Sequence, residues 1–134
     1  MSDFNTAIIE EFRANQGKLG GPFTGAPVLL LTTTGARSGK RRTNPVAYLP
    51  DGDRVVIFAS KAGAPTNPDW YHNLRAHPDV TVEIGDETRD VRAVVLEGKE
   101  RDELFARQKQ RMPGFADYEA KTDRVIPVIA LEAR

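Results

Sequence analysis

Three strand-like segments follow one another in the first half of the chain, with no helix-forming segment between them. They are residues 28–34, 43–49 and 54–59. The first is apolar and β-branched, and the second alternates in polarity, as β-strands do. Short connections such as Asp51-Gly52-Asp53 predict antiparallel pairing. Because consecutive parallel strands need a crossover between them, a doubly wound α/β fold is disfavoured.

The rest of the chain predicts three more strands and four helices. The strands are residues 80–84, 88–96 and 125–131, and the helices are residues 3–15, 68–76, 97–111 and 116–122. Ser2 or Asp3 is expected to cap the first helix, and Asn67 the second, with Pro68 at its first helical position. Pro127 favours an edge or strand-start position for the last strand. Six mostly antiparallel strands can close into a small barrel, which makes this an α+β domain.

Length and composition exclude several classes of protein. The chain of 134 residues suits one domain, residues 1–134, and carries 19 basic and 19 acidic side chains. This balance argues against a general nucleic-acid binder. The sequence has no cysteine, so disulfides, thiolate metal sites and a cysteine nucleophile are excluded. Without a membrane-spanning stretch or a secretory signal, a cytoplasmic protein is expected.

The first helix carries an apolar stripe of Phe4, Ile8 and Phe12, widened by Ile9. This spacing is typical of a helix that buries one face. The sequence leaves three alternatives open: packing on its own domain, packing on a second subunit in a homodimer, or weak contact with a membrane surface. Acidic residues on the polar face give membrane contact no electrostatic help.

A basic turn joins the first two strands. It contains Arg37, Lys40, Arg41 and Arg42, and no Asp or Glu occurs between residues 28 and 48. Uncompensated cations beside two glycines predict an anion site, although a solvated hairpin tip has the same composition. A P-loop is excluded, because Gly35 and Gly39 have three residues between them where that motif needs four.

A second candidate region follows the third strand. Residues 60–64 are small, polar and flexible, so their backbone N–H groups can face a ligand, and the next helix begins nearby. Trp70 suits either the core or ligand stacking, while His72 and His77 are expected to be structural or solvent-facing. There is no G-x-S-x-G, no H-E-x-x-H and no metal-ligand cluster. These features favour binding of a large anionic cofactor whose own chemistry does the work, with no metal.

Taken in order, the motifs at residues 30–45, 59–64 and 68–78 resemble the deazaflavin-dependent nitroreductase and quinone reductase family. Residues 4–13, 117–118 and 126–128 extend the resemblance over almost the whole chain. Members are oxidoreductases of actinobacteria and relatives that use coenzyme F420. The resemblance implies a split β-barrel, related to the FMN-binding and pyridoxamine-phosphate-oxidase-like barrels. The barrel would occupy residues 28–134, after an N-terminal helix and connection in residues 1–27.

The resemblance also assigns roles to residues. Cofactor binding falls to Arg37, Ser38, Lys40, Arg42, Asn44, Pro45, Val46, Ala59, Ser60, Lys61, Ala62, Gly63, Pro68, Trp70, Tyr71 and Asn73, with Arg41 less clearly placed. The basic turn would hold the phosphate and acidic tail, and residues 59–64 would line the deazaflavin ring. Phe115 and Tyr118 would line the substrate pocket, and Ser60 and Tyr118 would stabilise the developing anion. Phe115 lacks the hydroxyl that family nitroreductases often carry there, which disfavours nitroimidazole reduction relative to quinone reduction.

The implied reaction is hydride transfer from reduced F420 to an electron-poor acceptor such as a quinone, with nitroaromatic compounds and enones as further candidates. Two alternatives remain: an FMN-dependent split-barrel reductase, and a non-catalytic protein that binds F420 or another small ligand. The long basic turn favours F420, because its tail is polyanionic whereas FMN ends in one phosphate. Nucleic acid is not an expected partner. Attachment at the inner face of the cell membrane stays open.

Overall fold

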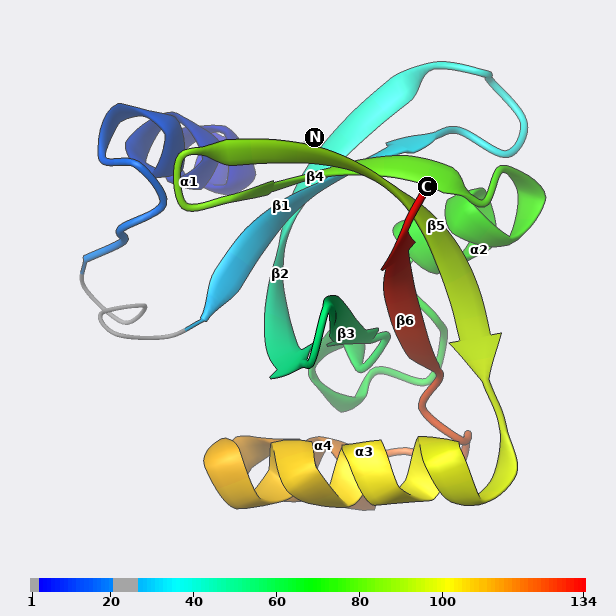
Figure 1. Cartoon of the computed structure of the whole chain (residues 1–134). Coiled ribbons are helices and arrows are strands. Elements are labelled where there is room, and N and C mark those ends of the chain that lie inside the picture. The colour runs from blue at the N-terminus through cyan, green and yellow to red at the C-terminus, as the bar shows by residue number, and fades with distance from the viewer. Residues whose placement is uncertain (1–2, 21–26) are drawn as a thin grey trace.

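The computed structural model describes residues 3–20 and 27–134 (Figure 1). Its elements are α1 (Asp3–Ala14), β1 (Val28–Thr34), β2 (Arg41–Asp51), β3 (Arg54–Phe58), the 3₁₀ helix η2 (Lys61–Gly63), α2 (Asp69–Ala76), β4 (Asp79–Ile84), β5 (Glu87–Leu96), α3 (Gly98–Arg111), α4 (Gly114–Ala120) and β6 (Val128–Ala133). The predicted cap residue Ser2 lies outside the described residues.

The six strands form one closed antiparallel barrel in the order β1-β2-β3-β6-β5-β4. Hairpins join β1 to β2, β2 to β3 and β4 to β5. Three pairings between strands that no hairpin joins, β1 with β4, β3 with β6 and β5 with β6, close the ring. The predicted fold class is therefore confirmed: an α+β domain built on a small split barrel.

Several predicted boundaries are wrong. The last strand begins at Val128 rather than at Val125, which is 75% exposed. Of the two positions that Pro127 favoured, the structure shows the start of the strand and not an edge, since β6 lies between β3 and β5. Pro127 precedes this strand, and its carbonyl accepts a hydrogen bond from the Ala59 N–H at 3.0 Å. A β-branched, apolar sequence does not reveal which of its residues reach the sheet. Helix α4 begins and ends two residues earlier than predicted.

The predicted N-cap of α2 is also wrong. Pro68 occupies the cap position with extended backbone, φ −67° and ψ 154°, and Asp69 is the first helical residue. The Asn67 side chain lies one residue outside the helix, where its Oδ1 accepts a hydrogen bond from Arg124 at 2.7 Å. A tertiary contact has therefore taken the oxygen that a local cap would use.

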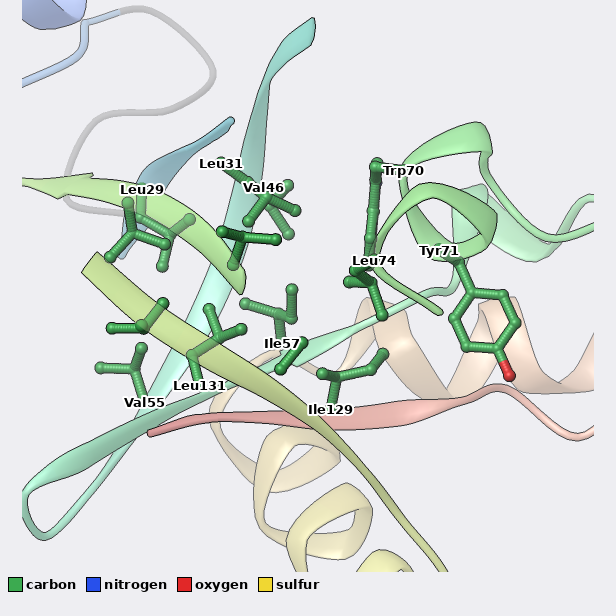
Figure 2. Packing of buried hydrophobic residues seen from close by; sticks show 14 of the residues in the cluster. Leu29, Leu31, Val46, Val55, Ile57, Trp70, Tyr71, Leu74, Ile129 and Leu131 are labelled. Atoms are coloured by element: carbon green, nitrogen blue, oxygen red, sulfur yellow. The ribbon is translucent and has the colours of Figure 1, made fainter. Parts of the chain in front are cut away.

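The barrel interior is filled by apolar side chains from alternate positions of the strands (Figure 2). In β1, Leu29 and Leu31 point inward, while Leu30 between them packs outside against α1. Helix α2 closes one end of the interior with Trp70, Tyr71 and Leu74, all buried. Burying large aliphatic and aromatic side chains in this way contributes roughly 1.5–3 kcal/mol each.

The outer face of the barrel is covered by three other helices. Helices α3 and α4 lie along one side and bury Phe105 and Phe115 against Phe58, with ring centroids 5.9 and 5.8 Å from the Phe58 ring. Helix α1 buries Ile9 and Phe12 against Leu30. The predicted stripe therefore packs on its own domain, although the side chain of Phe4 lies outside the described part. Within the described residues, no helix is long and apolar enough to cross a membrane.

Candidate active site

The turn between β1 and β2 is closed by its own backbone. The N–H of Gly35 donates to the Lys40 carbonyl at 2.7 Å, and the N–H of Gly39 donates to the Gly35 carbonyl at 3.0 Å. A Cβ atom on Gly35 would lie 2.5 Å from the Ser38 Oγ and 3.2 Å from the Lys40 carbonyl oxygen. Gly39 adopts φ +70°, in the left-handed region. The two glycines therefore permit a tight turn, on which the cations are carried.

Helix α2 holds this turn through Asn73. The Asn73 Oδ1 accepts a hydrogen bond from the Ala36 N–H at 2.9 Å, and its Nδ2 donates to the Thr33 Oγ1 at 3.1 Å. Both Asn73 and Thr33 are buried. The turn and α2 consequently lie at the same end of the barrel (Figure 1). Asn73, predicted as part of the cofactor wall, also fixes the position of the basic turn.

A cleft of about 750 Å³ lies between the basic turn and α2, within the usual range for small-molecule sites. It is lined by Gly35, Ala36, Arg37, Ser38, Arg42, Thr43, Asn44, Asp69, His72 and Asn73. Five of the predicted cofactor residues are therefore brought together here: Arg37, Ser38, Arg42, Asn44 and Asn73.

The cations of the turn are uncompensated in the folded protein too. Among the described residues, Arg37, Lys40, Arg41 and Arg42 form no ion pair, whereas Arg13, Arg54, Arg89 and Arg107 each bind a carboxylate. The strand register separates two of these cations. Arg42 pairs with Thr33, and Arg41 pairs with Thr34. Since neighbouring strand residues point to opposite faces, Arg42 faces the cleft and Arg41 faces away.

Sequence reasoning missed several residues of the lining. Asp69 and His72 were not proposed as site residues, and neither were Gly35, Ala36 and Thr43. His72 is exposed, as expected, but it lines the cleft. Asp69, His72 and Asn73 stand at i, i+3 and i+4 of α2, a spacing that places side chains on one helical face. That spacing could have grouped the three residues from the sequence alone. Only the position of the turn shows that their face of the helix lines the cleft.

The other predicted cofactor residues lie outside the lining of this cleft. Val46, Trp70 and Tyr71 belong to the barrel core, and Pro68 and Ala59 are also buried. Pro45 is half-buried in β2, and Lys40 is exposed at the end of the turn. The side chain of Ala62 lies outside the described part. Trp70 therefore packs as a core residue, the alternative that the sequence had left open.

The loop of residues 59–64 follows β3 and contains η2. Lys61 and Gly63 adopt left-handed backbone, with φ +47° and +82°. A Cβ atom on Gly63 would lie 2.8 Å from the Tyr118 carbonyl oxygen, so the loop packs tightly on α4. Ser60 is buried, and within the described residues its hydroxyl has no hydrogen-bond partner. The structure thus brings the loop of Ser60 against the helix that carries Tyr118.

Phe115 and Tyr118 lie one turn apart on α4, with ring centroids 5.2 Å apart. Phe115 is buried against Phe58, while Tyr118 is half-buried. Neither side chain lines the 750 Å³ cleft. Their roles in substrate binding therefore stay predictions, with Tyr118 the more accessible of the two.

Comparison with known proteins decides the family. Residues 6–133 match the model of the F420H(2)-dependent quinone reductase family. The chain belongs to this family. The F420H(2)-dependent quinone reductase Rv1261c of Mycobacterium tuberculosis is 38% identical over 129 residues, which cover 92% of this chain and 85% of the relative.

Solved structures agree with this assignment. An F420-H2 dependent reductase, FDR-A, is 42% identical to this quinone reductase with a TM-score of 0.73, covering 79% of this chain and 94% of the other. A structure described as a domain-swapped dimer is 38% identical with a TM-score of 0.75, covering 95% and 93%. A FAD-binding protein of Mesorhizobium loti, only 16% identical with a TM-score of 0.57, shares the fold.

As a member of this family, the protein is an enzyme that uses F420H2 as its reductant and a quinone as its acceptor. The family assignment supports F420 over the FMN alternative. The chain's own residues fit such a cofactor, because unpaired cations line a cleft of suitable size and offer an anionic group several donors.

Proposed function

We propose that this quinone reductase holds the phosphate and acidic tail of F420 in the cleft beside the basic turn. The observation that carries the proposal is the set of turn cations without ion pairs, two of which, Arg37 and Arg42, line the cleft. The Ser38 Oγ already accepts the Lys40 N–H at 3.2 Å, so its hydroxyl hydrogen stays available to an anionic oxygen. Asp69, also in the lining, repels an anion and favours its placement near the arginines.

We place the deazaflavin ring beside residues 59–63 and beside Asn44, Pro45 and Val46 of β2. Arg124 binds both the Ser60 carbonyl of this loop and the Asn67 side chain, and α2 begins two residues after Asn67 with Asp69, which lines the cleft. The bound cofactor supplies hydride to the acceptor. Backbone N–H groups of the loop, the Ser60 hydroxyl and Tyr118 would stabilise the negative charge that develops on the acceptor, with water as the source of the proton.

We also propose acceptors other than quinones. Nitroaromatic compounds and enones are also electron-poor and can accept hydride. Phe115 offers no hydroxyl and is buried in the core beside Phe58, so α4 brings only the Tyr118 hydroxyl as a phenolic donor. We expect quinone reduction to be faster than nitroimidazole reduction for this reason.

Tryptophan fluorescence tests cofactor binding directly. Trp70 is the only tryptophan, and it lies on α2, the helix that forms one wall of the cleft. Oxidised F420 should change its emission with an affinity that falls as salt rises, while FMN should bind weakly. Binding of FMN that is as tight as that of F420, or no binding of F420, would contradict the proposal.

Two arginine variants provide a matched pair. Arg42→Ala should weaken F420 binding about tenfold, because it removes a charge-assisted contact, and should reduce the dependence on salt. Arg41→Ala removes the same charge from the next residue, on the opposite face of β2, and should weaken binding less. Equal effects of the two substitutions would mean that only the general charge of the turn matters.

Assembly and location are further proposals. A relative of this chain has been solved as a domain-swapped dimer. We propose that this reductase also forms a homodimer, which sedimentation of the purified protein would test. We further propose a cytoplasmic location. Attachment to the inner face of the membrane receives less support, since Ile9 and Phe12 of α1 are buried in the domain.

A further inference from the structure

Arg124 lies in the connection between α4 and β6 and binds four acceptors around the loop that follows β3. Its Nε donates to the Ala64 carbonyl at 2.9 Å, and its Nη2 donates to the Ser60 carbonyl at 2.7 Å. Its Nη1 donates to the Ala59 carbonyl at 3.0 Å and to the Asn67 Oδ1 at 2.7 Å. One planar side chain therefore connects both ends of the loop.

Within the described part of the chain, Arg124 forms no ion pair with a carboxylate. Its partners are backbone carbonyls and one side-chain amide, and its burial lowers the pKa of the guanidinium. Arginine nonetheless stays protonated in proteins. A partly buried cation placed on three neighbouring carbonyls is suited to fixing a loop conformation rather than to pairing two charged surfaces.

These hydrogen bonds set the direction of the loop's N–H groups. In a trans peptide, the carbonyl of one residue and the N–H of the next point in opposite directions. Because the Ala59 and Ser60 carbonyls point at Arg124, the N–H groups of Ser60 and Lys61 point away from it. Within residues 3–20 and 27–134, neither of these N–H groups has an acceptor. Two donors are therefore held side by side without a partner.

We propose that Arg124 is a positioning residue that directs the Ser60 and Lys61 N–H groups toward the polar edge of the deazaflavin ring. This role rests on the proposed placement of the ring at this loop. Arg124 acts through the loop and does not touch the cofactor. Two parallel donors at fixed positions would bind a ring carbonyl more strongly as negative charge builds up on it.

Packing on α4 supports the same arrangement. The loop can approach α4 closely only because Gly63 lacks a side chain, and Arg124 follows α4 by four residues. The loop is thus fixed on one side by the backbone of α4 and on the other by the Arg124 guanidinium. Displacing Arg124 would leave Gly63 in contact with α4 but release the Ala59 and Ser60 carbonyls.

Substitution by lysine tests the role, because an ammonium group retains the charge but cannot reach four separated acceptors with a planar fork. The probes are oxidised F420 and 8-hydroxy-5-deazariboflavin, which carries the ring without the phosphate and tail. Arg124→Lys should weaken binding of the ring-only probe about tenfold, the effect of losing roughly one well-placed hydrogen bond. The salt dependence of F420 binding should stay as in the wild type, because the basic turn is untouched.

Arg101→Lys is the matched control. Arg101 is also partly buried and donates to a carbonyl in the same connection, that of Ile126, at 2.8 Å, but within the described residues it forms no hydrogen bond with the loop. This variant should bind the ring-only probe like the wild type even if it loses similar stability. Equal weakening in both variants would show a general structural effect and would overturn the proposal.

Amide hydrogen exchange without any ligand gives an independent result. The N–H groups of Gly63 and Ala64 donate to the Ser60 and Lys61 carbonyls, so a released loop should exchange them faster in Arg124→Lys. If the wild type binds neither probe, the proposed function fails and the role toward the ring fails with it, while exchange still reports whether Arg124 holds the loop. Unchanged exchange together with unchanged binding would overturn the inference.

A milder variant keeps the inference testable if Arg124→Lys does not fold. Asn67→Ala removes the 2.7 Å hydrogen bond from Arg124 and leaves the guanidinium on the carbonyls. Like Arg124→Lys, it should weaken binding of the ring-only probe and speed amide exchange in the loop, but by a smaller factor. No change in either measurement would count against the positioning role.

Discussion

Gly63→Ala should destabilise the protein more than an ordinary glycine substitution in a left-handed position. Gly63 has φ +82°, and a Cβ atom there would lie 2.8 Å from the Tyr118 carbonyl oxygen and 2.9 Å from the Lys121 Cβ. Gly52 has φ +63° and no atom within 4 Å of its Cβ position. The pair therefore separates the cost of the backbone conformation from the cost of the contact.

The expected magnitudes follow from these two environments. The left-handed conformation costs an L-residue about 1–2 kcal/mol at either position. The gain from a less flexible unfolded chain, about 0.4–1 kcal/mol, also applies to both. Only Gly63→Ala adds the overlap with α4, which costs about 1–3 kcal/mol as overpacking does elsewhere. The difference between the variants should therefore be about 1–3 kcal/mol, with Gly63→Ala less stable.

Urea unfolding followed by far-ultraviolet circular dichroism measures this difference, provided that both variants unfold with the same m-value. A second measurement links it to the site. Gly63→Ala should also weaken binding of the ring-only probe, since the loop must move away from α4, whereas Gly52→Ala should not. Equal free energies of unfolding for the two variants would refute the argument, because they would mean that the loop does not pack on the backbone of α4.

Two further predictions concern the frame of the site. Asn73→Ala should lower the free energy of unfolding by about 2 kcal/mol, because it removes two hydrogen bonds and leaves the buried Thr33 hydroxyl without its donor. Urea unfolding should show a much smaller effect for Asn44→Ala, whose side chain makes no hydrogen bond within the described residues. The second prediction concerns Asp51, whose pKa is lowered by hydrogen bonds from Arg54 and Arg107. Its contribution to stability is present above the unfolded pKa of about 3.9 and is lost as pH falls through the folded value. Between about pH 5 and 2, the free energy of unfolding of Asp51→Asn, measured by urea titration, should therefore fall less steeply with pH than that of the wild type. The same slope in both proteins would contradict this.

Much of the fold was predictable because it depends on neighbours in the sequence. The residues of β1 were predicted without error, since a run of apolar and β-branched residues bounded by glycine is a local signal. The turn at Gly35 and Gly39 was predictable for the same reason. The concentration of cations between residues 28 and 48 is also a property of the sequence alone, and it indicated the wall of the cleft that the structure contains.

Other features depended on contacts between distant residues. The sequence did not show that Trp70 packs in the barrel core, because helical spacing does not say what lies opposite a face. The charge pattern of the turn did not separate Arg41 from Arg42, and only the family resemblance placed Arg42 more clearly. Their faces follow from the register with Thr34 and Thr33, which also decides which positions of β2 point inward.

Arg124 shows this limit most clearly. Its acceptors lie 57 to 65 positions away in the sequence, and three of them are backbone carbonyls that any residue type supplies. Because every residue type has a backbone carbonyl, the sequence does not show which residues accept the hydrogen bonds of Arg124. The sequence by itself determined the number and order of the strands, the turn and the family. Closure of the barrel through β1 with β4, β3 with β6 and β5 with β6 decided which loops meet, because only these pairings bring the ends of distant segments together.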